Sequence, residues 1–384
     1  MNYYSQKRGR KIASNLLLHR GELLHNPVVE LTPDGEILSI EFVESSMLDY
    51  SPETEFYSGI MMAGFINVHS HLELAYLRGQ IEPYSGFAGF ASKIGQIRNN
   101  FSTKEREMAI VRANSEMRRG GVAAVGDITN GDSSFRTKER SEIEYRNFAE
   151  VFGLNTIDTK AVDNLLKYPL TSLTPHSTYS LNDKLFREIA ESGTTPLSIH
   201  FMESPSEMEL YEGRGSLHDW YSKVGFTCDF LGYGSPARRV VESVPKDRSV
   251  ILVHNCCVTQ SDIDTIMSHF TADVFWAVCP RSNRYISKLE PPIDLLRRNN
   301  LNICIGTDSL ASNWSLSILE ELCEMPNAPL LERLDWATRI GAQALQLSQF
   351  GEIEVGRHPR INILSGVDYQ TMELTDRSKI TRII

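Results

Sequence analysis

The feature that most constrains the fold is an alternation of two kinds of segment. A short apolar run rich in β-branched residues ends in a polar or ionisable residue, and a longer segment with helical periodicity follows. Eight such runs cover residues 61–71, 122–129, 145–153, 170–176, 196–203, 249–255, 272–279 and 302–308. Amphipathic stretches include residues 104–119, 182–191, 260–269, 292–299 and 315–324. This alternation favours parallel strands with crossover helices, and eight repeats predict a closed (β/α)8 TIM-like barrel of the α/β class.

The two ends of the chain do not follow this repeat. Residues 11–43 indicate short strands around the turn signal Pro33-Asp34-Gly35, and residues 351–364 have a similar pattern. We therefore expect both ends to form one small β-rich domain beside the barrel. The predicted boundaries are 1–59 for its N-terminal part, 60–345 for the barrel and 346–384 for its C-terminal part.

Composition excludes several classes of partner. The net charge of −10 and the pI of about 5.6 argue against nucleic acids and anionic membranes, because such contacts depend on Lys and Arg. No window approaches the roughly 20 apolar residues of a membrane helix, and residues 1–18 lack the pattern of a signal peptide. The six cysteines show no CxxC spacing, which is typical of free thiols. We expect a cytoplasmic protein.

Histidines gather at the ends of these runs, where barrel enzymes build their active sites. His69 and His71 stand near the end of the first run. Residues i and i+2 of a strand point to the same side, so both imidazoles can face one metal ion. Alone, this short motif is as compatible with surface or capping histidines as with a metal site.

The later runs end in the same way. His200 and Glu203 close the fifth run, His254 the sixth and Asp308 the eighth, while His176 ends the fourth. One such histidine is more often an ordinary core or turn residue than a ligand. Together, however, these ionisable groups would be costly to bury without a partner, and a shared cation removes that cost.

Six motifs carry a family resemblance. They are Gly64-Phe65-Ile66-Asn67-Val68-His69-Ser70-His71-Leu72-Glu73, Pro175-His176, His200-x-x-Glu203, Val253-His254-Asn255, Cys279-Pro280-Arg281-Ser282-Asn283 and Gly306-Thr307-Asp308-Ser309. As a set and in this order they resemble the amidohydrolase superfamily, in its branch of nucleobase and nucleoside deaminases and chlorohydrolases. Some stretches are similar to adenosine-type and aminodeoxyfutalosine-type deaminases.

The resemblance implies a role for each matching residue. The metal ligands would be His69, His71, His200 and Asp308. Glu203 would shuttle protons, and His254 would orient or polarise the attacking water or the attacked ring atom. Substrate contacts would come from Glu73, His176, Arg281, Ser282, Asn283 and Ser309. Binuclear members carry a bridging lysine or glutamate on the fourth strand, and residues 170–176 offer neither, which favours one metal.

The chemistry of these residue types agrees with such roles. Three imidazoles and a carboxylate suit a catalytic divalent cation, Zn²⁺ best, with Fe²⁺ and Mn²⁺ as alternatives. A metal-bound hydroxide would attack a ring carbon that bears an amino group, with Asp308 or His254 accepting the water's proton. Glu203 would protonate the adjacent ring nitrogen, and ammonia would leave.

The sequence therefore predicts a metal-dependent hydrolytic deaminase of an aminated, purine-like or adenosine-like heterocycle. The alternative is hydrolysis of another C–N or C–Cl bond, in a cyclic amide or a chlorinated triazine, at the same site. A non-enzymatic scaffold is a third reading, and the complete set of site residues argues against it. The expected partner is a small heterocyclic substrate. Since related folds often form dimers, a homodimer is a candidate assembly.

Overall fold

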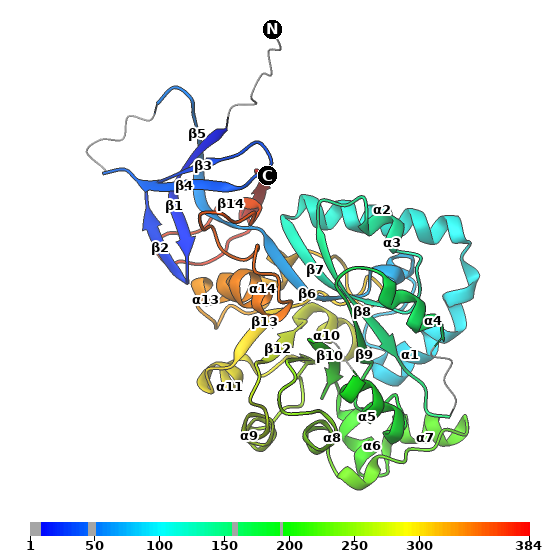
Figure 1. Ribbon diagram of the computed structural model, residues 1–384. Coiled ribbons are helices and arrows are strands. Elements are labelled where there is room, and N and C mark those ends of the chain that lie inside the picture. Colours follow the sequence, from blue (N-terminus) through cyan, green and yellow to red (C-terminus); the bar gives the residue numbers. More distant parts are fainter. Residues whose placement is uncertain (1–8, 45–50, 156–159, 193–194) are drawn as a thin grey trace.

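The computed structural model describes residues 9–44, 51–155, 160–192 and 195–384, and shows an α/β protein with parallel sheets (Figure 1). All eight predicted runs contain a strand. One parallel sheet has the order β6 (Phe65–Ser70), β7 (Val122–Thr129), β8 (Glu144–Val151), β9 (Thr171–Pro175). The other has the order β10 (Leu197–Phe201), β11 (Val250–His254), β12 (Val274–Val278), β13 (Asn302–Ile305).

The two sheets approach each other at both of their edges. An isolated parallel bridge joins Ser70, at the end of β6, to Asp308 beyond β13, and another joins Ser177 to His200. The carbonyl of His69 accepts hydrogen bonds from the backbone N–H groups of Thr307 (3.1 Å) and Asp308 (3.0 Å). The carboxyl ends of β6 and β13 therefore lie close to each other, and so do those of β9 and β10. Ionisable residues stand at these strand ends.

Helices connect the strands, and most residues of the strands are buried, as expected when helices cover a parallel sheet. The predicted amphipathic stretches form α2 (Thr103–Arg119), α5 (Asp183–Ser192), α9 (Gln260–His269), α11 (Ile293–Arg298) and α12 (Ile318–Cys323). The other helices are α1 (Gly86–Ile97), α3 (Phe135–Lys138), α4 (Lys160–Asp163), α6 (Pro205–Tyr211), α7 (Gly215–Lys223), α8 (Pro236–Ser243), α10 (Pro280–Ser287), α13 (Leu330–Asp335) and α14 (Gly341–Ala344). Among the described residues, no helix is long and apolar enough to span a membrane.

The two ends of the chain share a third sheet, of seven strands, which lies beside the parallel sheets in Figure 1. Its strands are β1 (Arg10–His19), β2 (Glu22–His25), β3 (Pro27–Leu31), β4 (Ile37–Phe42), β5 (Thr54–Ala63), β14 (Ile361–Ser365) and β15 (Lys379–Arg382). β14 pairs antiparallel with β5, so that Ile361 lies opposite Ala63. A separate apolar cluster that includes Ile12, Val29 and Ile363 packs this sheet.

The first predicted run, residues 61–71, is not one strand. Its first three residues complete β5 in the terminal sheet, and β6 begins only at Phe65. Gly64 separates the two strands, and a Cβ atom there would lie 2.5 Å from Cβ of Ala123. The close approach of these two segments explains why a glycine stands at this position. The apolar run on either side of Gly64 is divided between two sheets.

A second close approach gives a test of the strand packing. A Cβ atom on Gly126, within β7, would lie 2.4 Å from the carbonyl oxygen of Val68 and 2.7 Å from Cδ2 of Leu345. We expect Gly126→Ala to lower the free energy of unfolding by about 1–3 kcal/mol, because backbone atoms must move apart. Thermal unfolding followed by circular dichroism measures the change.

Gly95→Ala is the matched control, because Gly95 lies in helix α1 and a Cβ atom there meets nothing within 4 Å. It should leave the unfolding midpoint unchanged or raise it, since alanine favours a helix over glycine. Equal midpoints for the two variants would contradict the packing of β7 against β6.

Candidate metal centre and active site

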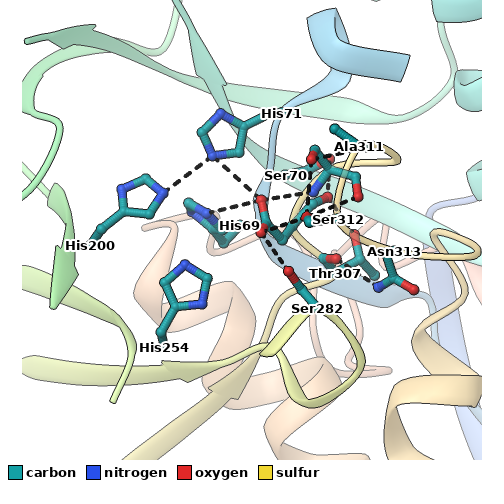
Figure 2. Close-up of polar contacts among 12 residues, drawn as sticks. His69, Ser70, His71, His200, His254, Ser282, Thr307, Ala311, Ser312 and Asn313 are labelled. Carbon is teal, nitrogen blue, oxygen red and sulfur yellow. Dashed lines mark hydrogen bonds and ion pairs between the residues drawn. The ribbon is translucent and has the colours of Figure 1, made fainter. Parts of the chain in front are cut away.

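Three imidazoles converge at the carboxyl ends of β6 and β10 (Figure 2). His69 lies on β6, His71 follows it directly, and His200 lies on β10. The Nε2 atoms of His71 and His200 are 3.3 Å apart, and one nitrogen from each of the three rings lies within 4.8 Å of the others. Both ring nitrogens of His69 are buried and have no hydrogen-bond partner among the residues that the structure describes. Buried nitrogens without a hydrogen-bond partner cost free energy, and a bound cation would satisfy them. These three histidines therefore fit the role of metal ligands.

The surroundings of these rings keep lone pairs available. Nδ1 of His200 lies 2.7 Å from the carbonyl oxygen of His176, which can only accept, so the proton sits on Nδ1 and Nε2 faces the cluster unprotonated. Burial, and then the neighbouring histidines, hold the pKa of His69 and of His200 well below the usual value. Both rings are therefore neutral near pH 7, as metal ligands must be.

Asp308 supplies a carboxylate on the same side of the cluster. Its Oδ1 atom lies 3.6 Å from Nε2 of His71 and 3.9 Å from Nε2 of His69. Its Oδ2 atom accepts hydrogen bonds from the hydroxyls of Ser282 (2.6 Å) and Ser312 (2.8 Å). Burial alone would raise the pKa of Asp308, but the nearby histidines and the Ser282 hydroxyl outweigh it and hold that pKa far below the usual range. Asp308 is thus an oriented carboxylate.

The spacing of these atoms suits one cation. Four ligands at the usual zinc distances of about 2.0–2.1 Å in a tetrahedron are separated by about 3.4 Å. The closest separations here are 3.3 Å between His71 and His200 and 3.6 Å between His71 and Asp308. The donor types and their geometry therefore fit a divalent metal ion.

Glu203 and His254 form the next layer of the site. Oε1 of Glu203 lies 3.8 Å from Nε2 of His254, and both side chains are almost fully buried. The amide nitrogen of Asn283 donates to Nδ1 of His254 over 3.0 Å, which places the ring proton of a neutral His254 on Nε2. The ring can therefore donate toward Glu203 or toward a bound molecule beside the cluster.

A largely buried ion pair lies beside His200 of the cluster. Nδ1 of His176 is 2.6 Å from Oε2 of Glu150, and Asn130 donates to the other Glu150 oxygen over 2.6 Å. Burial opposes the charge on both partners, yet their attraction raises the pKa of His176 and lowers that of Glu150 to about 2. Glu150, His176 and His200 are also close enough to form a second cation-binding group. Their hydrogen bonds already account for this arrangement.

Glu73 extends this flank. Its carboxylate accepts the backbone N–H of Asn130 at 3.2 Å, and burial raises its pKa to about 7. Hydrogen bonds thus connect Glu73 through Asn130 and Glu150 to His176. Two residues predicted as substrate contacts therefore belong to one polar chain.

The remaining predicted substrate contacts divide into two kinds. Ser282 and Asn283 bond to Asp308 and His254, and the backbone N–H of Ser309 donates to Asp308 over 2.8 Å. Arg281 instead pairs with Glu320, and its guanidinium lies over the ring of Trp314. Its partners in the structure are therefore outside the histidine cluster.

Sequence reasoning missed several residues that contact the site, among them Ser312 and Asn130, which donate to Asp308 and Glu150. Glu150 bonds to His176, and Tyr179 bonds to Glu203 over 2.9 Å. A carboxylate inside the apolar segment 147–151 is a signal that could have identified Glu150. Tyr179 lies three residues after His176 in a polar loop, and nothing in its local sequence distinguishes it.

Comparisons with known proteins agree with this geometry. The sequence profile described as "Amidohydrolase family" matches residues 60–382. An adenosine deaminase of Helicobacter pylori is 28% identical over 355 residues, which cover 86% of this chain and 85% of the relative. The structure of H. pylori aminofutalosine deaminase in complex with methylthio-coformycin aligns with a TM-score of 0.80 and 25% identity, covering 94% of this chain and 93% of that one.

A zinc-complexed atrazine chlorohydrolase from Arthrobacter aurescens TC1 aligns with a TM-score of 0.74 and 17% identity. The alignment covers 96% of this chain and 92% of that one. At this identity the likeness shows a shared fold.

The hydrogen bonds to Asp308 give a test of the metal centre. We expect Ser282→Ala to weaken retention of a divalent cation on the order of 10–100-fold, because the carboxylate loses a donor that orients it. Competition with a chelator of known affinity measures the change. Ser243→Ala is the control, since the buried Ser243 hydroxyl on α8 has no hydrogen-bond partner within the described part of the chain. Equal cation affinity in both variants would show that Asp308 is not a ligand held in this way.

Proposed function

The chain belongs to the amidohydrolase family, and we propose that it is a metal-dependent hydrolytic deaminase of an aminated heterocycle, of the purine or adenosine type. One observation carries the proposal: three imidazoles and the Asp308 carboxylate converge beside a buried acid–base pair, Glu203 and His254. The adenosine deaminase relative and the aminofutalosine deaminase structure support the choice of an amino leaving group.

We assign one divalent cation, with zinc favoured over iron and manganese, to His69, His71, His200 and Asp308. When bound, such a cation supplies a Lewis acid that lowers the pKa of water from 15.7 to about 7. The orphaned nitrogens of His69 and the fixed tautomer of His200 support this assignment.

Side chains of the protein accept and donate the protons of the proposed reaction. An Asp308 oxygen accepts the proton of the attacking water, while Nε2–H of His254 donates a hydrogen bond that orients the water or the attacked ring atom. The Glu203 carboxyl group delivers a proton to the ring nitrogen beside the attacked carbon, which allows that carbon to become tetrahedral. The Glu203 carboxylate then takes the proton of the newly added hydroxyl group and passes it to the amine, which leaves as ammonia while that oxygen becomes a carbonyl. The proton held by Asp308 finally returns to Glu203. General acid–base groups of this kind contribute about 10²–10⁴-fold to the rate.

The flank formed by Glu73 and His176 is proposed to bind the rest of the substrate, because it presents polar groups beside His200 of the cluster. Ser309 and Arg281 stay candidate substrate contacts. For Ser282 and Asn283 we propose supporting roles, since they hold Asp308 and His254 in place.

We also propose that the two parallel sheets form one (β/α)8 barrel over residues 60–345. The bridges at both edges, Ser70 to Asp308 and Ser177 to His200, support closure. The terminal sheet would then be a small β-rich domain built from residues 1–59 and 346–384, of which 1–8 and 45–50 lie outside the described residues. The pairing of β14 with β5 supports one shared terminal domain. Because residues 60–63 of β5 make this pairing, we move the boundary with the barrel from residue 59 to Ala63.

The leaving group gives the direct test of the function. Purified protein with about one zinc per chain is expected to release ammonia from at least one adenine- or adenosine-type compound in a panel of aminated purines, pyrimidines and nucleosides. A coupled glutamate dehydrogenase assay measures it. Release of chloride from a chlorotriazine, or of a carboxylate from a cyclic amide, with no ammonia from the panel would contradict deamination and favour the alternative hydrolase.

Substitution of Glu203 separates binding of the cation from chemistry. Glu203→Gln should keep the zinc content and lower kcat by about 10²–10⁴-fold, because the amide cannot carry the proton. Glu209→Gln is the control, since that partly exposed residue on α6 pairs with Arg214 instead. Full activity of Glu203→Gln would exclude Glu203 as the proton carrier.

A further inference from the structure

A tyrosine outside the predicted site contacts the proposed proton carrier. Tyr179 lies in the loop that follows β9, is 3% exposed, and its hydroxyl donates to Oε2 of Glu203 over 2.9 Å. The other carboxylate oxygen, Oε1, is the one that lies 3.8 Å from Nε2 of His254. The two oxygens of Glu203 therefore have different partners.

This difference matters because the terminal torsion of a glutamate is broad and weakly restrained on its own. A hydrogen bond to one oxygen fixes the plane of the carboxylate. It also leaves the opposite oxygen, which faces His254, free to exchange a proton. The backbone N–H of Glu203 is held separately, by Oε2 of Glu207 at 2.9 Å. The main chain and the carboxylate of Glu203 are thus positioned by different groups.

The loop that carries Tyr179 is itself anchored by a buried cation. The guanidinium of Arg239, on α8, donates to the carbonyl oxygens of Thr178 (2.6 Å) and Leu181 (2.9 Å), on either side of Tyr179. It lies between the rings of Phe186 and Phe230, 4.5 and 4.1 Å from their centroids. A fully buried arginine that binds two carbonyl groups leaves this loop little freedom.

Aromatic neighbours restrict the phenol further. The ring of Phe87, on α1, packs edge-on against Tyr179 with centroids 5.3 Å apart. The hydroxyl of Tyr221, on α7, donates to the carbonyl of Tyr179 over 3.2 Å, and that of Tyr211, on α6, donates to the carbonyl of Thr178 over 2.6 Å. The position of the Tyr179 hydroxyl is thereby set before any substrate binds.

We propose that Tyr179 is a positioning residue that holds the Glu203 carboxylate in its proton-transferring orientation. The role rests on the proposed function, since it acts through the proton carrier of that reaction. Tyr179 itself neither gains nor loses a proton in the reaction. Its hydroxyl keeps one oxygen of Glu203 occupied while the other exchanges the proton.

Tyr179→Phe tests this role, because phenylalanine keeps the ring packing and removes only the hydroxyl. We expect kcat for the best ammonia-releasing compound to fall on the order of 10–100-fold. KM, zinc content and the thermal unfolding midpoint should stay close to those of the wild type. Steady-state kinetics, elemental analysis and thermal unfolding provide the readouts.

Tyr145→Phe is the matched control. It removes another buried tyrosine hydroxyl, one that donates to Oδ1 of Asn114 over 2.8 Å instead of to Glu203. The kcat of this control variant should stay within about twofold of the wild type. Removal of a group that orients a site residue would instead lower kcat about 10–100-fold. In a Glu203→Gln background, Tyr179→Phe should cause no further loss of residual turnover.

The outcomes separate two kinds of failure. Absence of ammonia release by the zinc-loaded wild type would contradict the proposed function, and this role with it. Ammonia release by the wild type with equal losses of kcat in the two tyrosine variants would contradict the role of Tyr179 alone. A loss confined to KM or to zinc content would do the same.

Discussion

The structure depends on one electrostatic constraint: neutral imidazoles and a carboxylate are buried together at the ends of strands from opposite edges of two sheets. His69 is the penultimate residue of β6, His200 is the penultimate residue of β10, and Asp308 follows β13. Asp308 reaches His69 only because the chains meet at Gly306, where a Cβ atom would lie 2.8 Å from Cβ of His69. The close packing of the segments that follow β13 and end β6 therefore also brings the charged groups of the cluster together. A shared cation offsets the cost of burying these groups.

A second buried charge pair supports the loop beside the cluster. Oδ1 of Asp127, on β7, accepts the backbone N–H of Leu72 over 2.7 Å, directly after His71. Its Oδ2 atom lies 2.6 Å from Nζ of Lys138, and both side chains are almost fully buried. The carboxylate thus fixes the chain that carries a proposed ligand, while the lysine balances its charge. Removal of one partner would leave the other charge buried and unpaired.

Sequence alone predicted much of this arrangement, because the period of the apolar runs and the residues at their ends are local signals. The eight strands and the convergence of His69, His71, His200 and Asp308 follow from where parallel strands end. The break at Gly64 was not predicted, because an uninterrupted apolar run does not show that two sheets share it. Glu150 and Tyr179 were missed for a related reason. Their partners lie 26 and 24 residues away in the chain, and only the packing of loops brings them together.

The coordination of the metal ion tests the central claim most directly. X-ray absorption spectroscopy at the zinc edge of the zinc-loaded protein would report the ligands around the ion. We expect three imidazole nitrogens and a carboxylate oxygen at about 2.0–2.2 Å, with room for water and no second metal nearby. A thiolate ligand, a metal neighbour at about 3.5–4 Å as in two-metal sites, or fewer than three imidazoles would contradict the site described here.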